Sequence, residues 1–408
     1  MNGFRRLSDV TLIVVFALAL GVPAARFVLG RPKQPNVLAG ENRPPAPKPA
    51  FSTQRKALNR FPSRFEAYFQ DRLPGRELML QEQARIQVDW LDTSSSDKVI
   101  VGRDGWLFLD EEKSENPGRE ISPQEQCRRW AQEFRNRRDW LAHRGIEYLI
   151  VLTPEKHSVY PEFLPELYRH SRGPTAAELL AQTLRAQQGM NVLVLREVLL
   201  AALTPHPSPQ AWGEGNKSPP LPQLRERGPG VKGKPLYFHT DTHWNDEGAY
   251  VGYCALVNQL AARWPDLRPL EREQFEFDRS GRFTGDLCRM LHLPGERFEA
   301  FEAWRLRQPT ARRVAEELPF DARLYVGNRL LPQIWGRQDP NLPRAVLFHD
   351  SFAERIWLPA LAEHFDRLAY APTDGFDAQI VEALRPQIVI QQIVERKINR
   401  HLPEPLRR

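Results

Sequence analysis

The chain has 408 residues, 41% hydrophobic and 26% charged, so it is long enough for one large core with smaller appendages and has the charge content of an ordinary globular protein. The formal net charge is +6, but the basic excess is Arg scattered among Glu and Asp, without an aromatic-plus-basic motif, which argues against nucleic-acid binding. Cys127, Cys254 and Cys288 provide neither a disulfide framework nor zinc spacing; we expect buried free thiols, with a Cys127–Cys288 bridge as the alternative in an oxidising compartment.

The N-terminus carries an export signal. Arg5 and Arg6 precede an apolar run from Val10 to about Val28. Two interpretations of residues 1–30 remain open: a cleaved signal peptide, or a signal anchor that crosses the inner membrane once, which we favour. In both, the two arginines orient the N-terminus to the cytoplasm and the remainder of the chain is exported, which predicts a periplasmic domain.

A flexible linker and the start of the folded domain follow. Residues 31–50 are rich in Pro, Lys and Asn and cannot bury a core, so they predict a linker. We expect the catalytic domain to span residues 51–400. Its first elements are a helix at about 55–80, where aromatic residues recur at helical spacing, and a strand pair at 99–101 and 106–108.

The next segment has the pattern of a parallel β-α-β unit. A helix begins after Ser122, which is the expected N-cap of a capping box with Glu125. A continuous apolar run at 148–152, a helix at 176–186 and a second apolar run at 192–195 follow. Such runs are typical of strands that are buried on both faces of a parallel sheet.

The rest of the chain contains one insertion and then returns to the same pattern. Residues 204–234 are dense in Pro, Gly and Ser and predict a disordered insertion. A helix is expected at 246–262, a strand at 345–348 leading through a tight turn into a helix at 353–364, and a last strand at 387–393. The fold class is therefore α/β, a mostly parallel sheet flanked by helices after an N-terminal membrane segment.

Ser351 lies where the strand at 345–348 turns into a helix. This geometry exposes a hydroxyl at the carboxyl end of the sheet, where open α/β folds place their sites, and the backbone N–H of Ser351 could face an oxyanion. The alternative is that Ser351 is only a helix N-cap.

His243 and Asp241 supply what a serine nucleophile needs, a base and a carboxylate that orients it. Residues two apart in extended backbone share a face, so the Asp241 carboxylate can reach the imidazole. Two alternatives stay open. Asp241 could be a capping carboxylate beside a surface His243, or His239, Asp241, His243 and His349 could bind a metal.

The pattern resembles the alginate O-acetyltransferase family, the SGNH-hydrolase-like domains of periplasmic polysaccharide acetylation. The resemblance rests on Asp241-Thr242-His243 preceding Asp350-Ser351-Phe352, the reverse of the order in simple SGNH hydrolases. Weaker blocks extend it over most of the chain from about Phe61 to Arg400: FEAYFQDRLPGR, VIVGRDGWLFL, TPEKHSVYPEFLP and TGDLCRMLHLP.

The resemblance implies that Ser351 is the nucleophile, His243 the base and Asp241 its orienter. One departure is His349, where the family has a glycine that relieves a tight turn; the imidazole could instead face the pocket. Three further residues follow sheet strands and have either a substrate-binding or a structural role: Arg396, Lys156 and Tyr160.

Three functions are compatible with these residues. The first is an O-acetyltransferase that acetylates hydroxyls of an exported polysaccharide through a Ser351 acyl-enzyme, without cofactor or metal. The second is an acetylesterase with the same triad, and the third is an inactive glycan-binding component of an export complex. The resemblance implies a multipass membrane acyltransferase partner that supplies acetyl groups.

Overall fold

The computed structural model describes residues 2–29, 43–51, 53–110, 121–170, 174–203, 234–293, 297–325 and 330–406. The chain divides into two compact units, Met1–Val101 with Asp286–Arg297, and Gly102–Gly285 with Phe298–Arg408. The predicted domain that begins at residue 51 is therefore divided between the two units. Apart from Lys234, the predicted insertion lies outside the described residues.

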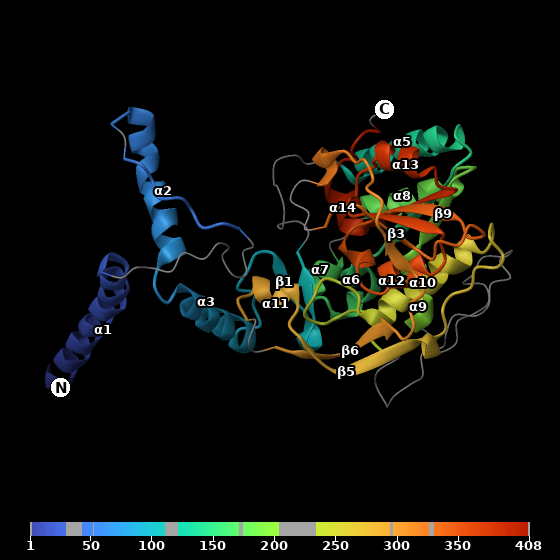
Figure 1. Ribbon diagram of the computed structural model, residues 1–408. Helices are drawn as coiled ribbons and strands as arrows, with labels where there is room; N and C mark the ends of the chain where they lie inside the picture. Colours follow the sequence, from blue (N-terminus) through green and yellow to red (C-terminus); the bar gives the residue numbers. More distant parts are fainter. Residues whose placement is uncertain are drawn as a thin grey trace. The chain divides into compact units, whose positions relative to one another are not determined.

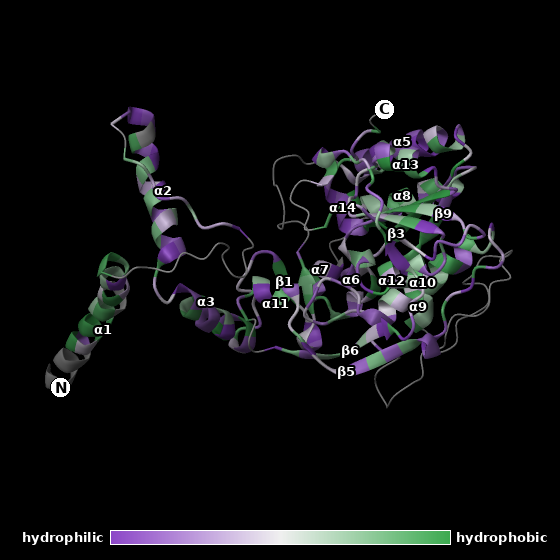
Figure 2. Ribbon diagram, in the orientation of Figure 1, coloured by the Kyte–Doolittle hydropathy of each residue, from purple (hydrophilic) through white to green (hydrophobic). Residues whose placement is uncertain are grey.

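The first unit begins with helix α1 (Asn2–Leu29), which contains a stretch, Asp9–Leu29, long and apolar enough to cross a membrane. Figure 2 shows this helix as hydrophobic along its described part. The helix expected at 55–80 is two helices, α2 (Arg55–Arg72) and α3 (Arg76–Arg85). The break has a local cause, because Pro74 lacks an N–H and Gly75 has a left-handed φ of 83°.

The second half of the predicted linker is held to α2. Residues 43–50 form neither helix nor strand. Both terminal nitrogens of Arg43 lie 2.8 Å from the Asp71 carboxylate, and the Ala46 N–H donates to the same carboxylate at 2.7 Å. The Arg43 guanidinium holds the pKa of Asp71 below its ordinary value. The first unit also contains β1 (Val99–Val101) and α11 (Asp286–Met290).

A seven-stranded sheet with the order β4-β3-β11-β9-β10-β8-β7 forms the centre of the second unit. Its strands are β3 (Glu147–Thr153), β4 (Asn191–Val194), β7 (Arg312–Val314), β8 (Gln333–Gly336), β9 (Arg344–Phe348), β10 (Arg367–Ala371) and β11 (Ile388–Val394). The first five strands in this order are parallel, and β8 and β7 add an antiparallel edge. The predicted mostly parallel α/β sheet is confirmed.

Helices cover both faces of this sheet (Figure 1). One face packs against α5 (Pro123–Ala142), α8 (Ala176–Ala186), α13 (Ala378–Leu384) and α14 (Glu395–Arg400). The other packs against α9 (Leu195–Leu203), α10 (Asp246–Leu260) and α12 (Trp357–Ala362). Successive side chains of a strand point to opposite faces of the sheet. Because the strands contain buried apolar runs, both faces are apolar, and each is buried by a layer of helices.

The remaining elements of the second unit connect these layers. They are β2 (Leu107–Leu109), α6 (Lys156–Val159), α7 (Glu166–His170), and an antiparallel pair of strands, β5 (Phe275–Phe283) and β6 (Glu299–Leu306). Ser122 caps α5 as expected, but the Glu125 carboxylate binds Arg128 and Arg129 rather than closing a capping box. All three cysteines are buried free thiols, as expected.

The helix expected at 353–364 begins later. Ser351–Ala353 is a 3₁₀ turn whose N-cap is Asp350, and α12 starts only at Trp357. Pro359 explains the shift, because proline is tolerated in the first helical turn and not further inside. Ser351 is therefore the first residue of a short turn and not the start of a long helix.

The carboxyl ends of β3, β9 and β11 meet at one edge of the sheet, because these strands are parallel neighbours. The residues that follow them are Lys156, Ser351 and Arg396 respectively. The fold therefore brings three predicted site residues to one edge, as expected for an open α/β sheet.

Candidate active site

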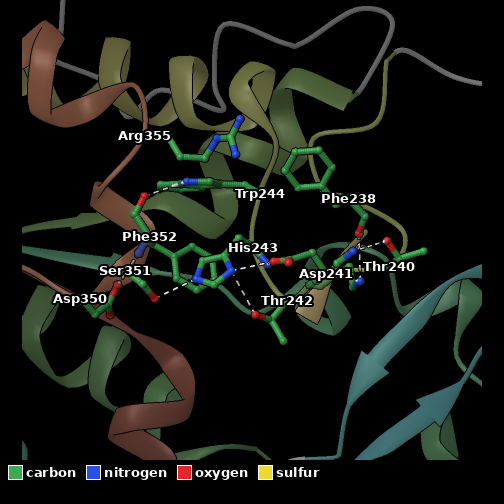
Figure 3. Close-up of polar contacts among 12 residues, drawn as sticks. Phe238, Thr240, Asp241, Thr242, His243, Trp244, Asp350, Ser351, Phe352 and Arg355 are labelled. Carbon is green, nitrogen blue, oxygen red and sulfur yellow. Dashed lines mark hydrogen bonds and ion pairs between the residues drawn. The ribbon is translucent and has the colours of Figure 1, made fainter. Parts of the chain in front are cut away.

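Asp241, His243 and Ser351 form a continuous hydrogen-bonded chain (Figure 3). His243 Nε2 lies 2.7 Å from Ser351 Oγ, and His243 Nδ1 lies 2.7 Å from Asp241 Oδ1. A carboxylate accepts, so Nδ1 carries the ring proton and Nε2 presents a lone pair to the Ser351 hydroxyl. The arrangement can remove a proton from Ser351, which is exposed, while Asp241 is buried.

The loop that carries Asp241 and His243 closes on itself between two short extended segments. Tyr237 and Trp244 form an antiparallel bridge, and the Asn245 N–H donates to the Leu236 carbonyl at 3.0 Å. Asp241 Oδ1 also accepts from the His243 backbone N–H at 2.9 Å, so local sequence alone aligns carboxylate and ring. The loop leads directly into α10.

Lys156 supports this loop through hydrogen bonds from its buried side chain. Its side chain is 2% exposed, and Nζ donates to the carbonyls of Phe238, His239 and Asp241 at 2.9, 3.0 and 2.7 Å. Tyr160 is also buried, and its hydroxyl accepts from the Leu236 N–H at 2.8 Å. These contacts are those of the structural role, one of the two predicted for these residues, and the substrate-binding role stays a prediction. Both hold backbone that positions the site.

Glu299 in β6 supports the other side of the loop. Its carboxylate accepts from the backbone N–H groups of His239 and Thr240 at 2.6 and 2.5 Å, and lies 3.1 Å from His239 Nδ1. Burial alone would raise the pKa of Glu299, but the hydrogen bonds from His239 and Thr240 hold that pKa below its ordinary value. Sequence reasoning missed Glu299, because it lies in an irregular Arg-rich segment without a recognisable motif.

Asp350 fixes the turn that presents Ser351. Its carboxylate accepts from the N–H of Phe352 at 2.9 Å, from the N–H of Val394 at 2.8 Å and from Gln392 Nε2 at 3.0 Å. Among the described residues, nothing accepts a hydrogen bond from the Ser351 N–H. This leaves the amide available to an oxyanion. Gln392, a polar residue inside the apolar strand β11, is the sequence signal that could have indicated this network.

Arg396 and His349 contact the residues on either side of Ser351. Arg396 pairs with Glu155 at 2.7 Å, and its guanidinium lies 5.3 Å from the centre of the Phe352 ring. The observed ion pair corresponds to the structural role, one of the two predicted for Arg396. His349 is 1% exposed, and its Nδ1 lies 2.9 Å from the Asp350 carbonyl oxygen.

The backbone at His349 lies outside the left-handed region, so a side chain is accommodated there without strain. The expectation that this position needs glycine does not hold in this chain. The predicted metal set is not assembled either, because His239 faces Glu299 and His349 faces the Asp350 carbonyl.

A cleft of about 350 Å³ adjoins the flanks of the Asp241 loop. Its lining combines aromatic and charged side chains, among them Phe301, Trp304, Lys234 and Arg279. Both cations are paired with Glu302. Asp246, another lining residue, pairs with Arg355, which is labelled in Figure 3. The cleft offers rings and hydrogen-bonding groups beside the segments that flank Asp241 and His243 in the sequence.

Comparison with solved structures gives matches of low similarity. The O-acetyltransferase domain of Pseudomonas putida AlgJ aligns with 74% of this chain and 92% of that domain, at 20% identity and a TM-score of 0.44. Bacillus cereus PatB1 aligns with 74% of this chain and 98% of its own, at 14% identity and a TM-score of 0.48. With TM-scores below 0.5, these likenesses carry no argument about function.

Two sequence relatives are named as members of the family that the motifs resemble. The chain is 24% identical over 296 residues to the probable alginate O-acetylase AlgJ of Pseudomonas fluorescens, which covers 72% of this chain and 62% of the relative. It is 27% identical over 197 residues to the probable alginate O-acetylase AlgJ of Pseudomonas putida, which covers 48% of this chain and 42% of the relative. The chain therefore spans less than two thirds of the length of each relative.

The match to a family is more extensive. The family model described as the SGNH hydrolase-like domain, acetyltransferase AlgX, matches residues 99–206 and 221–322, together just over half of the chain. The matched residues include Asp241 and His243 and end before Ser351, whose position is known here from the fold alone. This chain belongs to the SGNH hydrolase-like, AlgX-type acetyltransferase family.

Proposed function

We propose that the chain is an O-acetyltransferase that forms an acyl-enzyme on Ser351. His243 Nε2 accepts the hydroxyl proton as Ser351 Oγ attacks the acetyl carbonyl, and returns this proton to the departing donor group. His243 then takes the proton of an acceptor hydroxyl, whose oxygen attacks the acyl carbon. The bond from this carbon to Ser351 Oγ breaks, and His243 returns the proton to Oγ. Asp241 orients the imidazole and stabilises its cationic form. The 2.7 Å contact between His243 Nε2 and Ser351 Oγ is the observation that carries this proposal.

The acceptor in this proposal is a hydroxyl of an exported polysaccharide. Family membership supports acetyl transfer, and the two relatives named alginate O-acetylases support a polysaccharide. We place the glycan in the cleft beside the Asp241 loop, because sugar rings pack on aromatic side chains and bind polar groups at a rim.

Replacement of Ser351 tests the acyl-enzyme directly. Ser351→Ala should abolish turnover of a model acetyl ester and labelling by a fluorophosphonate, because no other group replaces the lost Oγ. Ser280→Ala is the matched control, since Ser280 is exposed and bonds only within its own turn to Asp278. Unchanged turnover in Ser351→Ala would refute the proposal.

Acetylesterase activity is the second candidate, favoured by the exposure of Ser351. Water that reaches the acyl-enzyme would hydrolyse it, since transfer differs from hydrolysis only in acceptor binding and water exclusion. Product analysis decides between them. Acetylated glycan in the presence of acceptor indicates transfer, whereas free acetate in equal amounts with and without acceptor indicates an esterase.

We also propose that α1 anchors the chain in the inner membrane with the second unit in the periplasm. The apolar length of Asp9–Leu29 and the preceding Arg5 and Arg6 support this orientation. Acetyl groups would then come from a multipass membrane acyltransferase partner. A reporter fusion to the C-terminus that is active only outside the cytoplasm tests the orientation, and a reporter active in the cytoplasm would contradict it.

A further inference from the structure

A second hollow lies between α12 and strands β8 and β10, and no residue of the candidate triad lines it. Its volume is about 290 Å³. The described lining is largely apolar and includes Leu331, Trp335, Leu358, Pro359 and Tyr370, together with His349. No Asp, Glu, Lys or Arg belongs to this described lining. The site therefore favours a neutral molecule over an anion or a cation.

His349 lines this hollow and has one ring nitrogen that can accept a hydrogen bond. The imidazole is 1% exposed, and its Nδ1 lies 2.9 Å from the Asp350 carbonyl oxygen. A carbonyl oxygen can only accept, so Nδ1 carries the hydrogen and Nε2 of the neutral ring has the lone pair. Burial lowers the pKa of His349, which keeps the ring neutral. Among the described residues, none donates a hydrogen bond to Nε2.

Three other polar side chains line the hollow, Tyr370, Trp335 and Gln333, and no hydrogen bond joins any of them to His349 among the described residues. The Tyr370 hydroxyl donates to the Leu358 carbonyl, and Trp335 Nε1 donates to Gln333 Oε1 at 3.3 Å. Neither donor is free for His349. A ligand that brings an O–H group can therefore donate a hydrogen bond to His349 Nε2 while its apolar part packs against the largely apolar lining.

We propose that this hollow, which we call the His349 pocket, binds a small neutral alcohol or phenol. The apolar body of the ligand packs against Trp335 and Leu358, and its hydroxyl donates to His349 Nε2. The volume is at the lower end of the range of small-molecule sites, about 300–1,000 Å³, so the ligand is a single ring or a short branched chain rather than a sugar oligomer. The proposal also gives the imidazole a use at a position where the family resemblance leads one to expect glycine.

Phenol and anisole distinguish this site from nonspecific apolar binding. Anisole keeps the ring and the oxygen of phenol but has no hydrogen to donate. We expect the full-length chain in detergent, titrated calorimetrically against a detergent blank, to bind phenol about tenfold more tightly than anisole. Equal affinities, or no binding of either probe, would overturn the proposal.

Two substitutions locate the binding site. His349→Phe keeps an aromatic ring and removes the acceptor, so the preference for phenol should vanish, whereas His143→Phe at an exposed position should keep it. Leu331 is 54% exposed, so Leu331→Trp can fill the hollow without disturbing the core, and should abolish binding of both probes. If His349→Phe fails to fold, Leu331→Trp decides alone. Phenol binding that survives Leu331→Trp would place the ligand elsewhere and refute the proposal.

Discussion

Asp241→Asn tests whether the carboxylate sets the protonation of His243. Asp241 Oδ1 accepts from His243 Nδ1 at 2.7 Å and from the His243 backbone N–H at 2.9 Å. An asparagine has the same shape, but its NH₂ group can donate to Nδ1. The ring proton then moves to Nε2, which faces Ser351 Oγ at 2.7 Å and can no longer accept the hydroxyl proton.

The expected loss is large because Asp241 is only 4% exposed and water cannot replace the carboxylate. In a triad, the wrong histidine tautomer and the lost stabilisation of the imidazolium together lower kcat by about 10³–10⁴-fold, or about 4–5.5 kcal/mol of transition-state free energy. The Asn variant should keep its fold, because side-chain volume and most local contacts are unchanged.

Turnover of 4-nitrophenyl acetate by the full-length chain measures this loss. Wild type, Asp241→Asn, Ser351→Ala and the double variant should be compared, with circular dichroism as the control for folding. Residues that act as one unit are not additive, so the double variant should be no slower than Ser351→Ala alone. Asp241→Asn that keeps more than about a tenth of wild-type kcat would refute the assignment of Asp241.

Two further variants test the parts that hold the site, and a pH dependence of stability tests a buried histidine. Lys156→Met removes the donor to three loop carbonyls, and the displaced loop should lower kcat about 100-fold in the same ester assay. Gly285→Ala would place a Cβ 1.9 Å from the Thr240 carbonyl oxygen, so the loop must move, the free energy of unfolding should fall by about 1–3 kcal/mol and turnover should drop. Burial lowers the pKa of His364 from 6.5 to about 4, so the unfolded chain binds more protons between these values. The free energy of unfolding, measured by urea denaturation, should have its full value above about pH 6.5. It should fall by up to about 3 kcal/mol as pH decreases towards 4.

Each of these variants has its own control. Lys98→Met, at an exposed lysine, should leave turnover unchanged, and equal effects of the two lysine changes would contradict the role of Lys156. Gly105→Ala strains only a turn, so it should lower stability without the matching loss of kcat. His364→Gln should flatten the pH dependence in part, since buried His349 titrates in the same direction; an unchanged slope would contradict the explanation.

Local sequence determined those strands and contacts that depend only on residues close together in the chain. Continuous apolar runs predicted β3 and β9, because strands buried on both faces need no alternation. Asp241 and His243 could be linked from their spacing alone, since a two-residue separation lets the carboxylate reach both the ring and the backbone N–H of the histidine. Helix ends were less accurate where Pro74 and Pro359 divide or delay a helix.

Only the tertiary structure decided which residues distant in sequence contact these local elements. Ser351 reaches His243 because β9 ends at the same sheet edge as its parallel neighbours, a relation that no local spacing encodes across a sequence separation of 108. Lys156 and Glu299 support the loop from segments remote in sequence, so their roles depend on packing rather than on a motif. His349 was singled out from the sequence as a missing glycine, and only the fold showed that its imidazole lines a separate hollow. Long-range contacts of this kind follow from sheet order and helix packing, which single-residue patterns do not specify.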